Sequence, residues 1–312
     1  MKLADLLRTS ADCVISGTTD KDVKELVYHS DKAGPGSVFF AIEGQLADGR
    51  KYIEKAVEKG AAAVVATGPV PAKTYGETTV IETKDVRKTM ARMSAQFYGR
   101  PSERLLVIGV TGTKGKTSTT FMIRQILEAA GIKTGIIGTV TNGYDGHMEE
   151  ASATTPQSVE IQRNLAEMEA AGCKAVVMEV SSQGLMHSRV DSVDFDIGVF
   201  TNISPDHIGE GEHADFEEYM SWKSLLFKRC RRAVVNCDDP RCEDIIRGSE
   251  LEQTVRFGRS SLADFRCVEQ QLWREKGVLG IKYKLFAGKP CGDDSTREIT
   301  VNLPGRFNVY NT

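Results

Sequence analysis

Residues 105–131 read LLVIGVTGTKGKTSTTFMIRQILEAAG, and this stretch determines the fold that the sequence predicts. Residues 105–110 are an apolar run of strand length, and a turn rich in glycine and threonine follows them. Beyond the turn, apolar residues recur at helical spacing at Ile123, Ile126 and Leu127. The stretch therefore predicts a strand, a glycine turn and a helix with one buried face.

This unit is a predicted phosphate-binding site, although a purely structural turn that carries glycine and lysine is the alternative. Glycines let backbone N–H groups approach phosphate oxygens, and the helix N-terminus adds the positive end of its dipole. In such loops the lysine, here Lys116, reaches the β- and γ-phosphates, and the hydroxyl of Thr117 binds Mg²⁺. The usual G-x-x-x-x-G-K-S/T pattern has its first glycine where Val110 stands here. The predicted nucleotide-binding residues of the loop are Gly112, Thr113, Lys114, Gly115, Lys116, Thr117 and Ser118.

The composition favours a cytoplasmic α/β protein of two domains. A length of 312 residues allows two cores, and a net charge of −3 gives no reason to expect nucleic acid or a membrane surface as partner. The N-terminus lacks an apolar leader, and no run of 18 apolar residues occurs. The seven cysteines lack C-x-x-C spacing, so we expect reduced thiols and no zinc site.

Residues 1–100 are predicted to form a small α/β domain. Apolar runs at 38–42 and 61–66 suggest strands, and a helix is expected near 50–59. A further helix at 85–98 carries one apolar stripe. Gly99, Arg100 and Pro101 break that pattern, so the second domain is predicted to span 101–312.

Two strands of the second domain end in polar residues. The strand at 175–178 runs into Glu179, and the strand at 195–200 runs into a polar segment that includes His207. Because ligands collect at the carboxyl ends of parallel strands, both side chains are expected to point towards the phosphate loop. Glu179 is a candidate Mg²⁺ ligand. The alternatives are a helix-capping carboxylate and an ordinary loop histidine.

The helix before the first of these strands is expected to start at Thr155, as N-cap, with Pro156 in its first turn and Gly172 at its end. Beyond 230, a strand is predicted at 233–236, followed by a β-rich stretch from 254 to 303.

That β-rich stretch includes a strand at 278–285 and a polar turn at 288–296. Residues 303–312 resemble the start of a helix. The predicted fold class is therefore α/β, with a mostly parallel central sheet and a β-rich C-terminal part.

A predicted helix at 215–230 carries a lysine in an unusual position. Lys223 falls in the middle of a stripe formed by apolar residues, where a charge is costly to bury. Its amine could reach water along a packed stem, or pair with a buried carboxylate. A third possibility is a lysine that is neutral or modified and works in the site. The stripe consists of Phe216, Tyr219, Met220, Leu226, Phe227 and Cys230.

Several motifs in one order resemble the ATP-dependent Mur ligases, most of all the type that adds the third residue of the peptidoglycan stem peptide to a UDP-N-acetylmuramoyl-dipeptide. The motifs are GVTGTKGKTSTT, ATTPQ, MEVSSQGL, RVD, FTNISPDH, EEYMSWKSLLF, VVNCDD and LPGRFNVYN. The resemblance implies that ATP phosphorylates the terminal carboxylate of the nucleotide-linked peptide. The amine of an amino acid then attacks the acyl phosphate.

The resemblance also implies roles for particular residues. Lys116, His207 and Lys223 would be catalytic, and Asn308 would lie near the adenine of ATP. Thr117 and Glu179 would hold one Mg²⁺, while His207 and a carbamylated Lys223 would hold a second. The residues expected to contact the UDP-linked muramoyl peptide are Ser30, Thr154, Thr155, Ser181, His187 and Arg189.

This sequence departs from the family in places. The family commonly has Asn at Lys114, His at Gln183, and D-S-R where His29, Ser30 and Asp31 stand. Members also carry a C-terminal amino-acid-binding domain that these residues lack. We therefore expect a monomeric fragment of a ligase that forms no amide bond alone.

Two alternatives to this function remain. A folylpolyglutamate synthase-like ligase would share the central domain, but Ser30 and the AIEG motif at 41–44 argue against it. A non-catalytic nucleotide-binding paralogue is the other, and the retained Lys116, Glu179 and Lys223 argue against that.

Overall fold

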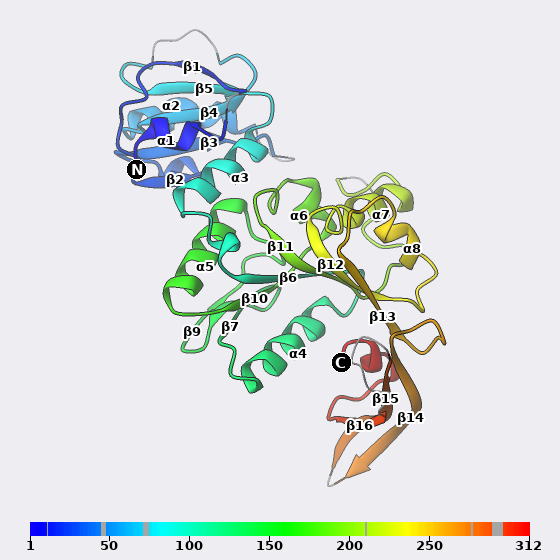
Figure 1. The fold of residues 1–312 in the computed structure, drawn as a ribbon. Helices are drawn as coiled ribbons and strands as arrows, with labels where there is room; N and C mark the ends of the chain where they lie inside the picture. Colours follow the sequence, from blue (N-terminus) through cyan, green and yellow to red (C-terminus); the bar gives the residue numbers. More distant parts are fainter. Residues whose placement is uncertain (11, 45–47, 71–74, 210, 276, 289–295) are drawn as a thin grey trace. The chain divides into compact units, whose positions relative to one another are not determined.

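The computed structural model of the protein describes residues 1–312 except 11, 45–47, 71–74, 210, 276 and 289–295 (Figure 1). The chain forms two compact units. The first comprises residues 1–101, 156–167 and 187–193, and the second comprises 102–155, 168–186 and 194–312. No helix in the described part of the chain is long and apolar enough to cross a membrane.

The first unit is built on a five-stranded sheet in the order β1-β5-β4-β3-β2, with only the β1–β5 pair antiparallel. Alternate side chains of the central strands supply two separate apolar cores. Val38 and Phe40 pack with α1 and α3, whereas Phe39 and Ala41 pack with α2. The predicted fold of this region is confirmed. The strands are β1 (Val14–Ser16), β2 (Glu25–Val27), β3 (Ser37–Ala41), β4 (Ala63–Thr67) and β5 (Thr79–Thr83), and the helices are α1 (Leu3–Leu7), the 3₁₀ turns η1 (Ser30–Lys32) and η2 (Gly49–Tyr52), α2 (Ile53–Glu58) and α3 (Val86–Phe97).

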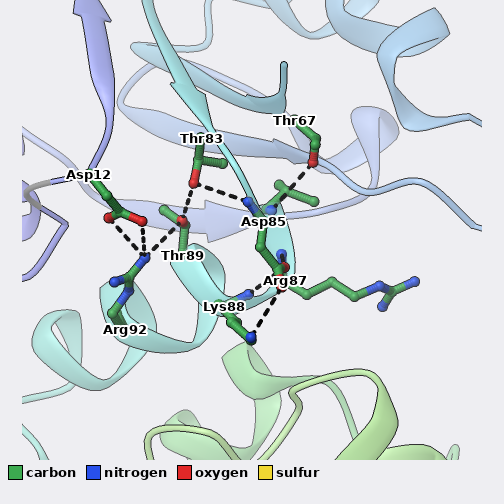
Figure 2. A network of polar contacts seen from close by, with 9 residues as sticks. Asp12, Thr67, Thr83, Asp85, Arg87, Lys88, Thr89 and Arg92 are labelled. Atoms are coloured by element: carbon green, nitrogen blue, oxygen red, sulfur yellow. Dashed lines mark hydrogen bonds and ion pairs between the residues drawn. The ribbon is translucent and has the colours of Figure 1, made fainter.

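The start of α3 is fixed by a polar network (Figure 2). The Asp85 carboxylate accepts hydrogen bonds from the backbone N–H groups of Arg87 and Lys88, both at 3.0 Å. The buried hydroxyls of Thr83 in β5 and Thr89 in α3 form a hydrogen bond of 2.8 Å, which links the strand to the helix. An N-cap of this kind typically stabilises a protein by about 1 kcal/mol.

The second unit contains an 11-stranded sheet, counted over the described residues, in the order β16-β15-β14-β13-β12-β11-β6-β10-β7-β8-β9. The central strands β14-β13-β12-β11-β6-β10-β7 are parallel to one another. Antiparallel strands extend the sheet at both edges, β15 and β16 at one and β8 and β9 at the other. The strands are β6 (Leu106–Thr111), β7 (Thr134–Ile137), β8 (Thr141–Tyr144), β9 (His147–Glu150), β10 (Ala175–Glu179), β11 (Phe195–Phe200), β12 (Cys230–Asn236), β13 (Gln253–Gly258), β14 (Phe265–Glu275), β15 (Val278–Ala287) and β16 (Thr296–Val301).

Strand β6 occupies the position that creates a site. Its neighbours β10 and β11 both follow it in sequence but lie on opposite sides of it. The connections therefore diverge at β6, and such a switch point opens a crevice at the carboxyl end of the strand. The phosphate loop predicted from the sequence begins there, at Thr111.

Helix α4 (Lys116–Ala129) covers one face of this sheet, and its predicted amphipathic face is correct only in part. Ile123 and Leu127 pack on Ile108 and Val110 of β6. Ile126, expected on the same face, is instead 62% exposed, because only the side of the helix that carries Ile123 and Leu127 meets the sheet.

Two other predicted helices have different bounds. Helix α5 (Ser158–Ala170) begins after Thr155, because the Thr155 hydroxyl is bonded to the carbonyl of Glu179 and the N–H of Ser181 and so does not cap it. Helix α7 (Phe216–Ser224) ends well before residue 230, because the chain turns there to place Cys230 at the start of β12. The remaining helices are the 3₁₀ turn η3 (Pro101–Glu103), α6 (Ser182–Met186), α8 (Cys242–Ile246) and the 3₁₀ turn η5 (Arg306–Tyr310).

The β-rich stretch after 253 is confirmed, and η5 stands where the start of a helix was expected. Most of the polar turn predicted at 288–296 lies outside the described residues. The six described cysteines are free thiols, as the sequence predicted.

Gly109, in the middle of β6, provides a test of this packing. A Cβ at that position would lie 2.8 Å from the Phe195 ring and 3.0 Å from Leu226. We expect Gly109→Ala to lower the free energy of unfolding by about 1–3 kcal/mol, because the core is overpacked. Gly34→Ala, whose methyl meets nothing within 4 Å, is the control and should change it by less than about 0.5 kcal/mol. Urea denaturation followed by circular dichroism measures both, and equal effects would contradict the packing.

Candidate active site

The loop between β6 and α4 has the backbone geometry that a phosphate site needs. Gly112 has φ +150° and Gly115 has φ +87°, conformations that favour glycine. A Cβ at Gly112 would overlap the Thr201 hydroxyl, and one at Gly115 would overlap the side-chain oxygen of Asn311. The Asn202 side chain accepts a hydrogen bond from the Lys114 N–H at 3.0 Å. The loop is therefore held in one shape by neighbours that tolerate only glycine at these two positions.

Two lysines share one acceptor in this loop. The Nζ of Lys116 donates to the Gly112 carbonyl at 3.0 Å and to the Thr113 carbonyl at 3.1 Å. The Nζ of Lys223, from α7, donates to the same Gly112 carbonyl at 2.9 Å. The structure thus brings together two residues that are distant in sequence and were both predicted to be catalytic.

Lys223 is buried, with 1% of its surface exposed, which excludes the possibility that its amine reaches water. Among the described residues it forms no ion pair, and its amine lies 4.6 Å from the centre of the Tyr219 ring. Burial lowers the pKa of Lys223 well below its ordinary value, and the charge of Lys116 lowers it further. Burial also lowers the pKa of Lys116. A buried amine with a lowered pKa is a candidate functional group.

Tyr219 connects α7 to the loop. Its side chain is fully buried, and its hydroxyl lies 3.1 Å from the Thr113 hydroxyl. The Thr113 hydroxyl also bonds with the backbone of Ser204, beyond the end of β11. The sequence predicted Tyr219 only as a core residue, because a periodic stripe does not reveal that its hydroxyl meets the loop.

Glu179, at the carboxyl end of β10, meets Thr117 as the sequence predicted. The Thr117 hydroxyl donates to the buried carboxylate at 3.0 Å. Thr139 donates to it twice, from its N–H at 2.8 Å and its hydroxyl at 3.1 Å. Sequence reasoning missed Thr139, although its place just after strand β7 was a signal, since neighbouring parallel strands end at the same edge.

These oxygens fit Mg²⁺. Adjacent oxygens in an octahedral shell with bonds of 2.0–2.1 Å lie about 2.9 Å apart, close to the 3.0 Å between Thr117 and Glu179. No cluster of three or more His, Cys, Asp or Glu that could hold a metal occurs in the described part of the chain. A metal here would therefore complete its shell with water and phosphate oxygens, as Mg²⁺ commonly does.

His207 lies in the segment that follows strand β11. Its Nδ1 is 3.0 Å from a carboxylate oxygen of Glu212, and its ring centre is 6.2 Å from that of Tyr219. Its backbone has φ +55°, which is uncommon for a residue other than glycine and costs on the order of 1 kcal/mol. His207 and Lys223 therefore both lie near Tyr219, as a shared site would require.

The residues predicted to contact the muramoyl peptide fall in both units. The Thr154 hydroxyl lies 3.0 Å from the Thr139 hydroxyl, and the Thr155 hydroxyl links Glu179 to Ser181. These lie in the second unit, beside Glu179. The Ser181 hydroxyl accepts from the N–H of Gly184 at the start of α6.

The remaining predicted contacts lie in the first unit. Ser30 is buried in η1, and His187 and Arg189 belong to the segment 187–193. Burial lowers the pKa of the Arg189 guanidinium, and the charge of Arg87 lowers it further.

A cavity of about 660 Å³ adjoins the loop in the second unit, and Lys114, Gly115 and Ser118 line it. Asn311 lines it as well, whereas the predicted Asn308 is buried and binds the Pro304 carbonyl and Asn311. The motif at 303–311 pointed to this segment, but the sequence could not show which asparagine faces the cavity. The other lining residues that sequence reasoning missed are Asn202, Asn236, Asp238, Asp239, Pro240, Phe307 and Tyr310.

Comparisons with known proteins show which sequences this chain is similar to. A family model described as "Mur ligase middle domain" matches residues 110–312, and one described as "Mur ligase family, catalytic domain" matches residues 22–98. A UDP-N-acetylmuramoyl-L-alanyl-D-glutamate–2,6-diaminopimelate ligase of Caldanaerobacter subterraneus subsp. tengcongensis is 38% identical over 312 residues. That match covers 100% of this chain and 62% of the relative, so the chain spans less than two thirds of the relative's length.

Solved structures show the same fold. The structure of a UDP-N-acetylmuramoyl-L-alanyl-D-glutamate–2,6-diaminopimelate ligase superposes with a TM-score of 0.82 at 22% identity, over 100% of this chain and 61% of that one. A folylpolyglutamate synthase of Mycobacterium tuberculosis gives a TM-score of 0.54 at 16% identity, over 70% of this chain and 55% of that one.

The hydrogen bond between Tyr219 and the loop can be tested. Tyr219→Phe removes one buried hydroxyl and should lower the free energy of unfolding by about 0.5–1.5 kcal/mol. Urea denaturation followed by tryptophan fluorescence reports on the second unit, which contains both tryptophans, Trp222 and Trp273. Tyr144→Phe in the same unit is the control, with an expected change below about 0.5 kcal/mol. No difference between the two variants would contradict the link.

Proposed function

The chain belongs to the Mur ligase family, and we propose that it provides the nucleotide-binding and muramoyl-peptide-binding parts of an ATP-dependent amide ligase of peptidoglycan synthesis. The amide bond would join the third stem-peptide residue to UDP-N-acetylmuramoyl-dipeptide. The observation that carries this proposal is the convergence of Lys116 and Lys223 on the Gly112 carbonyl, beside the Thr117–Glu179 pair. The relative's name suggests 2,6-diaminopimelate as the incoming amino acid.

The first step of the proposed reaction is phosphoryl transfer. A carboxylate oxygen of the peptide attacks the γ-phosphorus of ATP, the bond to the β,γ-bridging oxygen breaks, and ADP leaves. Lys116 would then leave the loop carbonyls and bind the transferring phosphoryl group, whose negative charge it neutralises. The backbone N–H groups of Gly115 and Lys116, at the start of helix α4, would bind the neighbouring phosphate oxygens.

In the second step the amine of the amino acid attacks the acyl carbon, inorganic phosphate leaves, and the amine loses a proton. Bound Mg²⁺ would supply positive charge that stabilises the phosphate oxygens in both steps. Thr117 and Glu179 would hold one ion, and His207 with a modified Lys223 would hold the second. The pairing of Glu179 with the Thr117 hydroxyl fixes both ligands before any metal arrives.

We propose that Lys223 is carbamylated. Its neutral amine would attack CO₂, form an N–C bond and release a proton, which converts a cation into a carboxylate-type oxygen ligand. Three facts support this: the amine is buried, its pKa is lowered, and its hydrogen-bond acceptor is a carbonyl. A positive charge would be unfavourable there, because Lys116 binds the same oxygen.

We also propose the division of labour between domains. Residues 1–100 would bind the uridine diphosphate end of the substrate through Ser30, and residues 101–312 would bind ATP through the loop and the cavity that Asn311 lines. His187 and Arg189 would bind the anionic muramoyl peptide, as would Thr154, Thr155 and Ser181. We propose that the protein acts as a monomer in the cytoplasm, where ATP is present and thiols stay reduced.

The alternative of a folylpolyglutamate synthase-like ligase is less well supported. The similarity to such an enzyme covers 70% of this chain, whereas the Mur ligase family models match residues in both halves of the chain. A non-catalytic nucleotide-binding paralogue would not need the buried Lys223 and Glu179. Burial of ionisable side chains costs free energy, so their presence favours a catalytic role.

The role of Lys116 predicts a specific loss. Lys116→Ala should weaken MgATP binding by about 10–100-fold, the range expected when a charge-assisted hydrogen bond is removed. Calorimetric titration of the 312-residue chain measures this loss. Lys228→Ala, which removes an exposed lysine of the same unit, is the control and should leave the affinity unchanged. Equal affinities of the Lys116 variant and the original protein would refute the loop assignment.

Carbamylation of Lys223 predicts a chemical signature. With ¹³C-labelled bicarbonate and Mg²⁺, the ¹³C spectrum should show a carbamate signal that is absent from Lys223→Arg, because the guanidinium does not react with CO₂. Lys223→Ala should lose binding of Mn²⁺ at the second metal site and regain part of it with acetate, which can supply the missing oxygen ligand. If the labelled protein lacks the carbamate signal, the modification is disproved while the loop assignment stands.

A further inference from the structure

We propose that Glu212 is a positioning residue for His207, which it holds in the tautomer and orientation needed to ligate a divalent cation through Nε2. This inference rests on the proposed function, because it takes His207 as a ligand of the second Mg²⁺. It adds a residue that neither the motifs nor the comparisons identify.

The contact itself defines the tautomer. Nδ1 of His207 lies 3.0 Å from Oε1 of Glu212. An ionised carboxylate only accepts hydrogen bonds, so Nδ1 must carry the proton. In the neutral ring Nε2 then keeps its lone pair free for a metal. Histidine ligands in proteins commonly donate their other N–H to a carboxylate or carbonyl, which fixes the ring.

Backbone hydrogen bonds among the described residues around His207 and Glu212 support this contact. The N–H of His213 donates to the carbonyl of His207 at 3.1 Å, and the N–H of Gly209 donates to the carbonyl of His213 at 3.1 Å. The N–H of Glu212 donates to the carbonyl of Gly209 at 3.0 Å. These bonds bring Glu212 back beside His207, whose left-handed backbone, φ +55°, begins the loop.

A buried histidine anchors the far end of the loop. His213 is 0% exposed, and its Nε2 lies 2.9 Å from the hydroxyl of Ser182, at the start of α6. Its ring centre lies 5.2 Å from that of Tyr219. The residue next to Glu212 is therefore fixed to the body of the second unit, so Glu212 orients His207 against a rigid support.

The location of the His207–Glu212 pair indicates that it orients the His207 ring rather than stabilises the fold. The side chains of His207 and Glu212 are 51% and 42% exposed, and exposed ion pairs contribute little to stability. Yet the His207 ring lies beside Tyr219, over which the amine of Lys223 also lies. A fixed ring would direct Nε2 at a place that Lys223 can share, whereas a freely rotating ring would not.

Nuclear magnetic resonance tests the tautomer without any metal. The chain has five histidines, and a long-range ¹H–¹⁵N spectrum of ¹⁵N-histidine-labelled protein at pH 8 distinguishes the two tautomers of each. The His207 signals are assigned from their loss in His207→Gln. We expect the Nδ1–H form in the original protein and a shift towards Nε2–H, the form that neutral imidazole favours in water, in Glu212→Ala.

The control is Glu217→Ala. Glu217 is an exposed carboxylate of the same segment that pairs with Arg241 at 3.5 Å, and its removal should leave the His207 tautomer unchanged. Thermal unfolding verifies that all variants are folded. If His207 keeps the Nδ1–H tautomer in Glu212→Ala, the proposal is overturned.

Metal binding provides the second measurement. Mn²⁺, titrated into the chain with bicarbonate and a non-hydrolysable ATP analogue, is followed by electron paramagnetic resonance. Loss of a carboxylate that orients a ligand typically weakens metal binding about 10–100-fold, so Glu212→Ala should show that loss and Glu217→Ala none.

The outcomes separate the two levels of the proposal. Weaker Mn²⁺ binding in His207→Gln but not in Glu212→Ala overturns the positioning role and leaves the proposed function intact. Unchanged Mn²⁺ binding in His207→Gln refutes His207 as a ligand, and with it both the second metal site and the role of Glu212.

Discussion

The rest of the site depends on the carbonyl of Gly112. It accepts hydrogen bonds from Lys116 and Lys223, so one oxygen joins the phosphate loop to helix α7. The geometry exists only because residue 112 lacks a side chain, since a Cβ would overlap the Thr201 hydroxyl. With φ at +150°, the peptide also turns its carbonyl to a direction that other residues rarely reach. A single backbone conformation therefore controls both lysines.

Sharing that oxygen places two cationic side chains together in a poorly hydrated environment. Burial lowers the pKa of Lys223 and the charge of Lys116 lowers it further, while burial also lowers the pKa of Lys116. Asp206 opposes it, because its charge raises the pKa of both lysines. Phosphate would relieve the repulsion at Lys116, and loss of a proton would relieve it at Lys223. In the proposed reaction these two residues of the same type would therefore have different chemistry.

The sequence predicted the parts of this site that lie at the ends of regular elements. Glu179 meets Thr117 because strand β10 is hydrophobic up to Glu179, its last residue, and ends at the same edge as β6. Tyr219, Glu212 and Asn311 were beyond its reach. Their roles depend on which way one side chain points from a helix or loop, and apolar periodicity fixes the face of an element without fixing the partner of a hydroxyl or carboxylate. Apolar runs therefore located the strands that were predicted. Helix ends were displaced, because side chains such as Thr155 have other partners than the helix they were expected to cap.

The two proposed metal positions differ in how they are held. Glu179 is 1% exposed and takes three hydrogen bonds from Thr117 and Thr139, so that position is rigid before metal arrives. His207 is half exposed, on a strained loop, and its proposed co-ligand exists only after Lys223 is modified. A preorganised pair of oxygens binds a hard cation with little reorganisation, whereas the second position has to be assembled. The first ion would therefore bind with the nucleotide, and the second would bind once Lys223 is modified.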